Sequence, residues 1–346
     1  MMCSVVRRMI LFAALASVAS DFALAQAPSD YTNGVASFRA GDYSRAVAFF
    51  RKAEADAPNT TDALVLAAKA LVHLERFTEA EDALRTYLAS QTDSPDALYL
   101  LGYVLNRENR PADSLEIYTK AAARQKPTGD DLKIVGLNYV LLEDYANAIH
   151  WLERAVEFEP GNAEAWYFLG RAYYTRSRMS EAKTAFEKVL QLHPKDSKAE
   201  NNLGLVLQSE ARPAEAVAAY KQAIAWQEAG AKQSEQPYLN LGTVLLDEGR
   251  DEEALPALKK AVQLSGGNSL CRLKLGIAYL RLSKLESARA ELEEAARLDP
   301  ENPAIHFQLG KLYKQLHLLE QAQKEFRRAE EIHSRAAAVA APKPTP

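Results

Sequence analysis

The chain has 346 residues, of which 48% are hydrophobic and 25% charged, and its formal net charge is −4. This composition is ordinary for a folded chain and supplies enough apolar residues for a continuous core. The acidic balance argues against a nucleic-acid partner, as does the lack of any basic stripe with interleaved aromatic residues. Length alone would suggest about two globular domains.

Residues 1–25 are predicted to be a secretory signal peptide. Arg7 and Arg8 form a positive start, residues 9–19 are apolar, and residues 23–25 match a small-x-small cleavage site. The apolar stretch is too short to cross a hydrocarbon layer of roughly 30 Å as a helix. We therefore expect cleavage after Ala25, an exported chain that is periplasmic or secreted, and no membrane span in the mature protein.

From residue 27 onward the same pattern of apolar and small residues returns, and neighbouring copies mostly start 34 residues apart. Nine copies start at residues 27, 61, 95, 129, 163, 197, 235, 269 and 303. The clearest copy, 163–196, contains two amphipathic stretches with helical spacing. A short polar turn, Arg176-Ser177-Arg178, separates the two stretches, and Pro194 ends the second one.

Small residues occupy fixed positions, which we number from the first residue of each copy. Position 8 is glycine in eight copies (Gly34, Gly102, Gly136, Gly170, Gly204, Gly242, Gly276 and Gly310) and Ala68 in copy two. Position 20 is alanine in eight copies and Ser114 in copy three. Only 15 of the 346 residues are glycine, so this column is not a chance result. We expect these small residues to let two helices approach closely.

These landmarks resemble the tetratricopeptide repeat family. The matching residues in the clearest copy are Trp166, Leu169, Gly170, Tyr173, Ala182, Phe186 and Pro194. The resemblance implies an all-α fold, a right-handed superhelical solenoid of about nine stacked helix-turn-helix tetratricopeptide repeats over residues 27–335. Such helices cannot bury their apolar faces alone, so each pair needs a neighbouring pair. One elongated solenoid therefore replaces the two globular domains that length suggests.

Several stretches depart from the repeat. Copy two looks the loosest, because its turn at residues 74–76 lacks a helix breaker. Four extra residues lie within 226–234; a longer second helix could absorb them, or they could bend the stack and divide the binding surface. Pro256 falls inside a second helix, where it removes a backbone hydrogen bond. Residues 336–346 are rich in alanine and proline and are predicted to be a disordered tail.

No arrangement of residues indicates catalysis, a cofactor or a metal. The six histidines are scattered, and none forms the i, i+4 pair of a zinc-binding helix. Cys271 would be the one cysteine of the mature chain, and we expect it to act as a small buried hydrophobic residue. No phosphate-binding loop is present. The sequence therefore predicts a protein that is not an enzyme.

The first helix of each copy uses positions 4, 7, 8 and 11 for the core, so positions 2, 5, 9, 12 and 13 project from the other side. In the family that side lines a concave groove, and the resemblance implies that it binds partners here. The candidate residues are Tyr31, Phe38, Tyr99, Tyr103, Arg107, Tyr167, Arg171, Tyr174, Asn201, Arg281, Lys311 and Lys314. Tyrosine and arginine are frequent in recognition surfaces. The alternative is that the aromatic residues merely pack between adjacent first helices.

We therefore expect a non-enzymatic scaffold or assembly factor of the cell envelope that binds another protein or an extended peptide in the groove. The alternative is a structural envelope component that acts through self-association or through its convex face, in which case a homo-oligomer is possible. The fold suggests both roles only by analogy.

Overall fold

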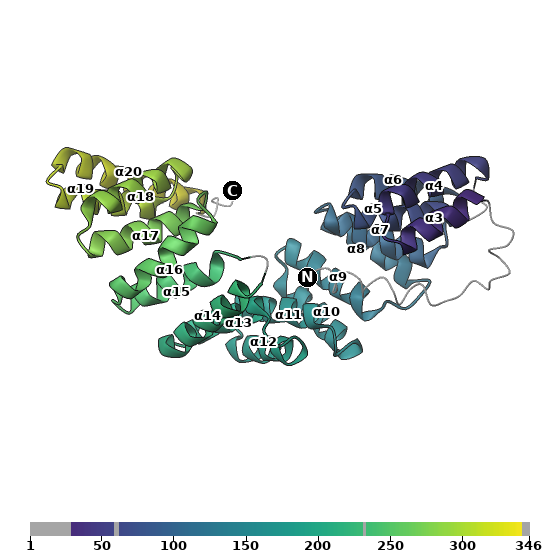
Figure 1. Cartoon of the computed structure of the whole chain (residues 1–346), viewed down its shortest axis with the longest axis horizontal. Helices are drawn as coiled ribbons and strands as arrows, with labels where there is room; N and C mark the ends of the chain where they lie inside the picture. Colours follow the sequence, from purple (N-terminus) through teal and green to yellow (C-terminus); the bar gives the residue numbers. More distant parts are fainter. Residues whose placement is uncertain (1–28, 59–61, 231–232, 341–346) are drawn as a thin grey trace, which may run out of the picture. The chain divides into compact units, whose positions relative to one another are not determined.

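The computed structural model describes residues 29–58, 62–230 and 233–340, which form eighteen α-helices and, within those ranges, no strand (Figure 1). The all-α repeat fold is thus confirmed, while the predicted signal peptide lies outside the described residues. The chain divides into two compact units, and the boundary in the sequence follows Ala185, within α12 (Met179–Leu192). The first unit contains α3 (Ser29–Arg39), α4 (Tyr43–Asp56), α5 (Ala63–His73), α6 (Phe77–Ser90), α7 (Pro95–Arg107), α8 (Pro111–Ala122), α9 (Gly129–Leu141), α10 (Tyr145–Phe158) and α11 (Ala163–Thr175). The second contains α13 (Ser197–Ser209), α14 (Pro213–Glu228), α15 (Gln236–Asp247), α16 (Asp251–Leu264), α17 (Ser269–Arg281), α18 (Leu285–Leu298), α19 (Pro303–Gln315) and α20 (Leu319–Ala340).

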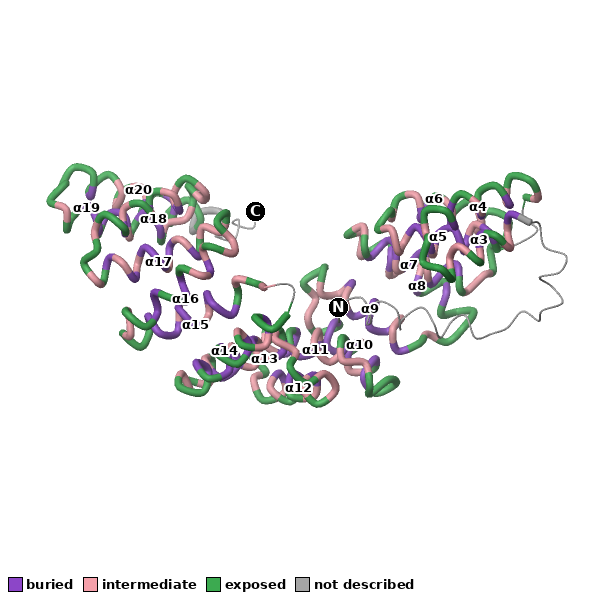
Figure 2. The backbone as a smooth tube through the Cα atoms, in the orientation of Figure 1, coloured by how far each residue is buried: buried purple, intermediate pink, exposed green. Residues whose placement is uncertain are grey.

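Each copy contributes two helices, and the first helices of successive copies also touch. In the first unit α5 contacts α7, α7 contacts α9 and α9 contacts α11; in the second unit α13, α15, α17 and α19 follow one another in the same way. First helices meet one another more extensively than second helices do. Within each unit, therefore, the first helices lie on the inner side of the stack. Exposed residues gather at the turns, and buried ones follow the packed faces (Figure 2).

Glycine at position 8 lies against the large side chain at position 24 of the second helix. The pairs are Gly34 with Phe50, Gly102 with Tyr118, Gly136 with Leu152, Gly204 with Tyr220, Gly242 with Leu258, Gly276 with Leu292 and Gly310 with Phe326. A Cβ atom on Gly204 would lie 2.5 Å from the Tyr220 ring, closer than van der Waals contact permits. The alanines of position 20 are buried beside this contact, as expected. The predicted close approach of the two helices is confirmed.

Gly204→Ala should therefore destabilise the protein, although alanine favours a helix over glycine by about 1 kcal/mol. Overpacking a rigid, fully buried ring costs about 1–3 kcal/mol, and the 2.5 Å approach to Tyr220 places this site at the upper end. We expect a net loss of about 1–2 kcal/mol in the free energy of unfolding, measured by urea denaturation. Gly267→Ala is the control, because nothing lies within 4 Å of its added Cβ. Equal stability of the Gly204 variant and wild type would contradict the packing argument.

The turn between the two helices has the same backbone conformation in all nine copies. Position 15 has a positive φ in Gly41, Glu75, Asn109, Glu143, Ser177, Ala211, Gly249, Ser283 and His317. In copy six, Arg212 N donates to Leu207 O and Ala211 N donates to Gln208 O, which is the Schellman pattern that ends a helix. Copy two forms the same turn at Glu75, so the expectation that it is the loosest copy is wrong at this turn.

Ala211 is the most strained of these residues, because its side chain offers no polar group to the turn and its φ is +56°. Left-handed backbone costs a residue with a Cβ about 1–2 kcal/mol, whereas glycine tolerates it. Ala211→Gly should raise the free energy of unfolding by about 0.5–1 kcal/mol after the added flexibility of the unfolded chain is deducted. Gly249→Ala, at the same position of the next copy, should lower it by a similar amount. Urea midpoints that move in the same direction for both variants would refute this.

Ser114 departs from the alanine column because it belongs to a buried polar chain. Its hydroxyl donates to the carbonyl of Gly102 (2.6 Å) and accepts a hydrogen bond from the amide of Asn138 (2.8 Å). The Oδ1 of Asn138 in turn accepts from the amide of Asn106 (2.8 Å). All three side chains are buried. These hydrogen bonds between buried side chains link α7, α8 and α9.

Two stretches of the second unit differ from the expected pattern. Helix α14 has 16 residues against 14 in α16, so the helix absorbs only part of the insertion. The connection that follows is held by Gln227, whose side-chain amide donates to Ser234 O and accepts from Ser234 N, both at 3.0 Å. Helix α20 continues to Ala340, so the tail predicted as disordered is helical over 336–340, because alanine is a strong helix former. Residues 341–346 lie outside the described ranges.

Candidate partner-binding surfaces

The twelve predicted groove residues divide into three groups by exposure. Arg107, Arg171, Arg281, Lys311 and Lys314 are exposed, while Tyr31, Phe38, Tyr103, Tyr167 and Tyr174 are half-buried. Tyr99 and Asn201 are buried, each 8% exposed. Position 5 is thus mostly a packing position between first helices, whereas positions 9, 12 and 13 reach the surface in several copies.

Tyr99 and Asn201 are corrections to the predicted site. The Tyr99 hydroxyl donates to Gln125 O at 2.6 Å, its ring packs against Tyr118, and burial raises its pKa to about 12. Asn201 accepts a hydrogen bond from Asn240 on the next first helix (2.9 Å). Neither side chain presents a free surface to a partner. Both join neighbouring helices instead.

On the first-helix side, an exposed arginine contacts two aromatic side chains. The Arg107 guanidinium lies 4.8 Å from the centre of the Phe77 ring and donates to the Tyr103 hydroxyl at 2.9 Å. Arg107 is exposed, and no acidic side chain pairs with it in the described part of the chain. Cation–π contact and a hydrogen bond therefore hold this charge in place without neutralising it.

A second aromatic group lies one copy earlier, at the equivalent place. The rings of Tyr43 and His73 stack with their centres 4.1 Å apart, and Phe38 meets both edge-on. Phe38 was predicted from the sequence, but Tyr43 and His73 were not. Position 17 of one copy meets position 13 of the next in both groups, Tyr43 with His73 and Phe77 with Arg107. The 34-residue spacing could have revealed this pairing.

Among the other predicted residues, Arg281 and Tyr31 join neighbouring copies. Arg281 donates to Leu246 O (2.5 Å) and pairs with Asp251 (3.2 Å), while the Tyr31 hydroxyl donates to Asp62 at 2.6 Å. Lys311 lies 4.9 Å from the centre of the exposed Phe307 ring.

The sequence did not reveal Lys133, a buried position-5 lysine. Burial lowers its pKa, but Glu164 and Asp130, each at 2.8 Å, outweigh burial and raise it above its ordinary value.

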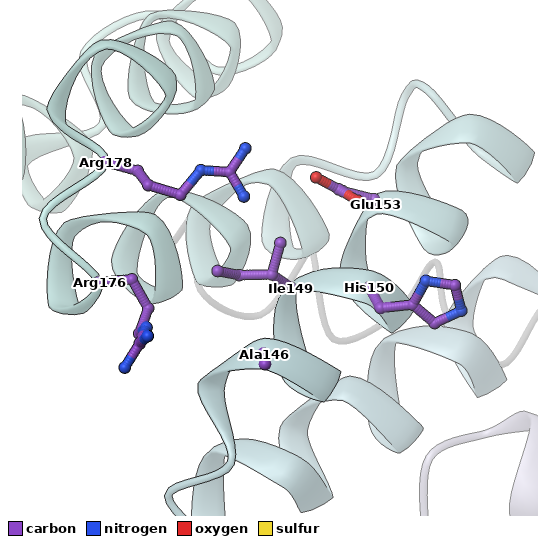
Figure 3. A pocket seen from close by; sticks show the side chains of 6 residues that line it. All are labelled: Ala146, Ile149, His150, Glu153, Arg176 and Arg178. Carbon is purple, nitrogen blue, oxygen red and sulfur yellow. The ribbon is translucent and has the colours of Figure 1, made fainter.

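A shallow hollow of about 400 Å³ lies on another part of the first unit (Figure 3). Its walls are the outer face of α10 (Ala146, Ile149, His150 and Glu153) and the turn after α11 (Arg176 and Arg178). Ile149 lies at its centre, and the Arg178 guanidinium extends across it toward Glu153 (Figure 3). The sequence marked these two arginines only as part of a polar turn. Hereafter we call this feature the arginine hollow.

The described residues contain no cluster that could bind a metal ion and no membrane-spanning helix. Among them, no three His, Cys, Asp or Glu side chains gather as a metal site would require, and no helix is long and apolar enough to cross a membrane. Cys271 is fully buried, and burial raises its pKa to about 11. This thiol is protonated at neutral pH and acts as a small apolar side chain, as expected.

Models of the tetratricopeptide repeat match residues 37–102, 139–203 and 245–295, and further models of the same repeat match 195–265, 276–316 and 303–333. A segment of 37 residues is 54% identical to the cytochrome c-type biogenesis protein CycH of Pseudomonas aeruginosa. That segment is 11% of this chain and spans only 9% of the relative's length. The match therefore extends over little more than one repeat.

Several solved structures share the fold. The Cut9–Hcn1 hetero-tetramer of APC/C is 15% identical with a TM-score of 0.57, over 84% of this chain and 60% of that one. A tetratricopeptide repeat protein from Parabacteroides merdae is 15% identical with a TM-score of 0.55, over 72% and 97%. The C-terminal part of a repeat protein from Cytophaga hutchinsonii is 17% identical with a TM-score of 0.51, over 81% and 99%. At such identities the likeness concerns the fold alone.

Proposed function

Because this chain belongs to the tetratricopeptide repeat family, we propose that it is a non-enzymatic scaffold that binds another protein or an extended peptide on the first-helix side of its stacked helices. Folds of this family typically serve as protein-interaction scaffolds. The observation that carries the proposal is Arg107, an exposed charge held in place by Phe77 and Tyr103. A side chain ordered before binding loses little entropy when a partner arrives.

The aromatic group of Phe38, Tyr43 and His73 supports the same surface. These three rings lie beside the turns of copies one and two, where they remain half-buried. Aromatic rings next to an ordered arginine make up the kind of surface in which a few residues carry most of the binding energy. A partner segment with apolar and acidic side chains would complement it.

The first-helix side can be tested by crosslinking in cells. We expect a photoreactive phenylalanine analogue at Arg171 to give a discrete protein adduct, because this position is exposed on a first helix. The same analogue at Phe158, which is 65% exposed on a second helix, is the matched control. Tyr103→Ala with Arg107→Ala should abolish the adduct formed at 171 while the circular dichroism stays helical. Adducts of equal yield from Phe158 would remove the first-helix assignment.

We also propose that the chain is exported and works as an assembly factor of the cell envelope. The charged start, the apolar stretch and the small-x-small site at residues 23–25 support export. The amino-terminal sequence of the protein purified from cells should then begin at Gln26. An intact mass that includes residues 1–25 would contradict export by cleavage.

A further inference from the structure

Arginine at position 16 follows the turn in five copies and pairs in each with an acid three residues later, in four of them through two nitrogens. Arg76, Arg212 and Arg250 each bind both oxygens of Glu79, Glu215 and Glu253, through Nε and Nη2 at 2.6–2.8 Å. Arg110 places the same two nitrogens on Asp113. Two-point contacts of this kind pair the guanidinium charge with a carboxylate and fix the orientation of its plane.

Arg178, in copy five, is held differently. Only its Nε bonds to Glu181 (2.9 Å), because the guanidinium lies 4.4 Å from the centre of the Tyr173 ring. The four other copies have leucine at the position of Tyr173, namely Leu71, Leu105, Leu207 and Leu245. The Tyr173 hydroxyl donates to Glu153 at 2.5 Å, which fixes the ring. The two terminal nitrogens of Arg178 therefore remain directed over the arginine hollow (Figure 3).

The charge at position 14 is reversed in the same copy. Glutamate occupies this position in copies three, six and seven, and in the first two, Glu108 and Glu210, it accepts a hydrogen bond from Arg110 (3.4 Å) and Arg212 (2.9 Å). Copy five has Arg176 instead. In the described part of the chain the Arg176 side chain forms no hydrogen bond or ion pair. Copy five thus lacks the carboxylate that bonds to the arginine in copies three and six, and carries a second cation in its place.

We propose that the arginine hollow binds an aspartate or glutamate side chain of a partner protein, which takes the place that Glu108 and Glu210 fill in their own copies. Arginine suits this role because its planar fork matches a carboxylate. Ile149 and Ala146 provide apolar contact for the stem of that side chain. Glu153 and Glu181 also face this region, but Tyr173 and Arg178 already engage them. The site lies on α10 and the turn after α11, so it is independent of the first-helix side.

The proposal is tested with Arg176→Glu, which places a glutamate at position 14 as in copies three and six. This variant should fold normally, and its own carboxylate should occupy the proposed binding site in the arginine hollow. Arg154→Glu makes the same change in net charge on α10 outside the hollow, where Arg154 pairs with Glu157 at 3.7 Å. The probe is an end-blocked octapeptide of alternating glutamate and alanine. Binding is followed through the Nε–Hε signals of the full chain labelled with nitrogen-15 arginine.

In the wild type we expect saturable shifts of the Arg176 and Arg178 signals. Affinity should fall at least about tenfold in Arg176→Glu and stay within about twofold in Arg154→Glu. The proposal would be overturned by an absence of saturable shifts, by an equal loss in both variants, or by equal shifts with a glutamine–alanine peptide. Inorganic phosphate that saturates the same signals at the same concentration would overturn the assignment to a carboxylate.

Discussion

The close contact between glycine at position 8 and a large side chain at position 24 is the constraint on which each helix pair depends. With no Cβ on one helix, the ring of Phe50, Tyr118 or Tyr220 can lie directly on the backbone of the other. The two helices then pack at short distance, which brings the alanines of position 20 into the same buried layer. Because interiors are close-packed, the pair has little freedom to rearrange, and copies can be stacked with nearly the same geometry.

The packed helix pairs are nearly the same in every described copy, whereas the residues in the turns and at the outward positions vary from copy to copy. Every described turn has one residue with positive φ at position 15, yet the residues around it range from acids to paired arginines. Changes at positions 13, 14, 16 and 17 alter charge and aromatic content without disturbing the packed layer. The contact of Arg107 with the Phe77 ring and the two arginines of the arginine hollow both lie at these variable positions. Recognition in such a protein therefore depends on substitutions around the turns as well as on the first-helix surface.

Residues that break the repeat pattern tend to meet one another in space. Ser114 and Asn138 each depart from their columns, and each satisfies the other's polar group in the core. In copy five, Arg176 replaces the glutamate of copies three and six, and the contact with the Tyr173 ring leaves Arg178 directed into the hollow. A single departure of this kind would leave a buried polar group or a surface charge without a partner. The buried pair of Ser114 and Asn138 is structural, whereas the exposed change at Arg176 is a candidate for binding.

The sequence by itself determined the helix pairs, their number and the tight contact at position 8, because repetition at 34 residues repeats one local solution. It also identified Cys271 as a buried apolar residue. It did not determine which projecting side chains are accessible: Tyr99 and Tyr103 lie one helical turn apart, yet only Tyr103 remains at the surface. Exposure, the stacking of Arg107 on Phe77 and the environment of Arg178 depend on contacts between different copies or between different helices. Only the tertiary structure decides such contacts, because helical periodicity describes one helix at a time.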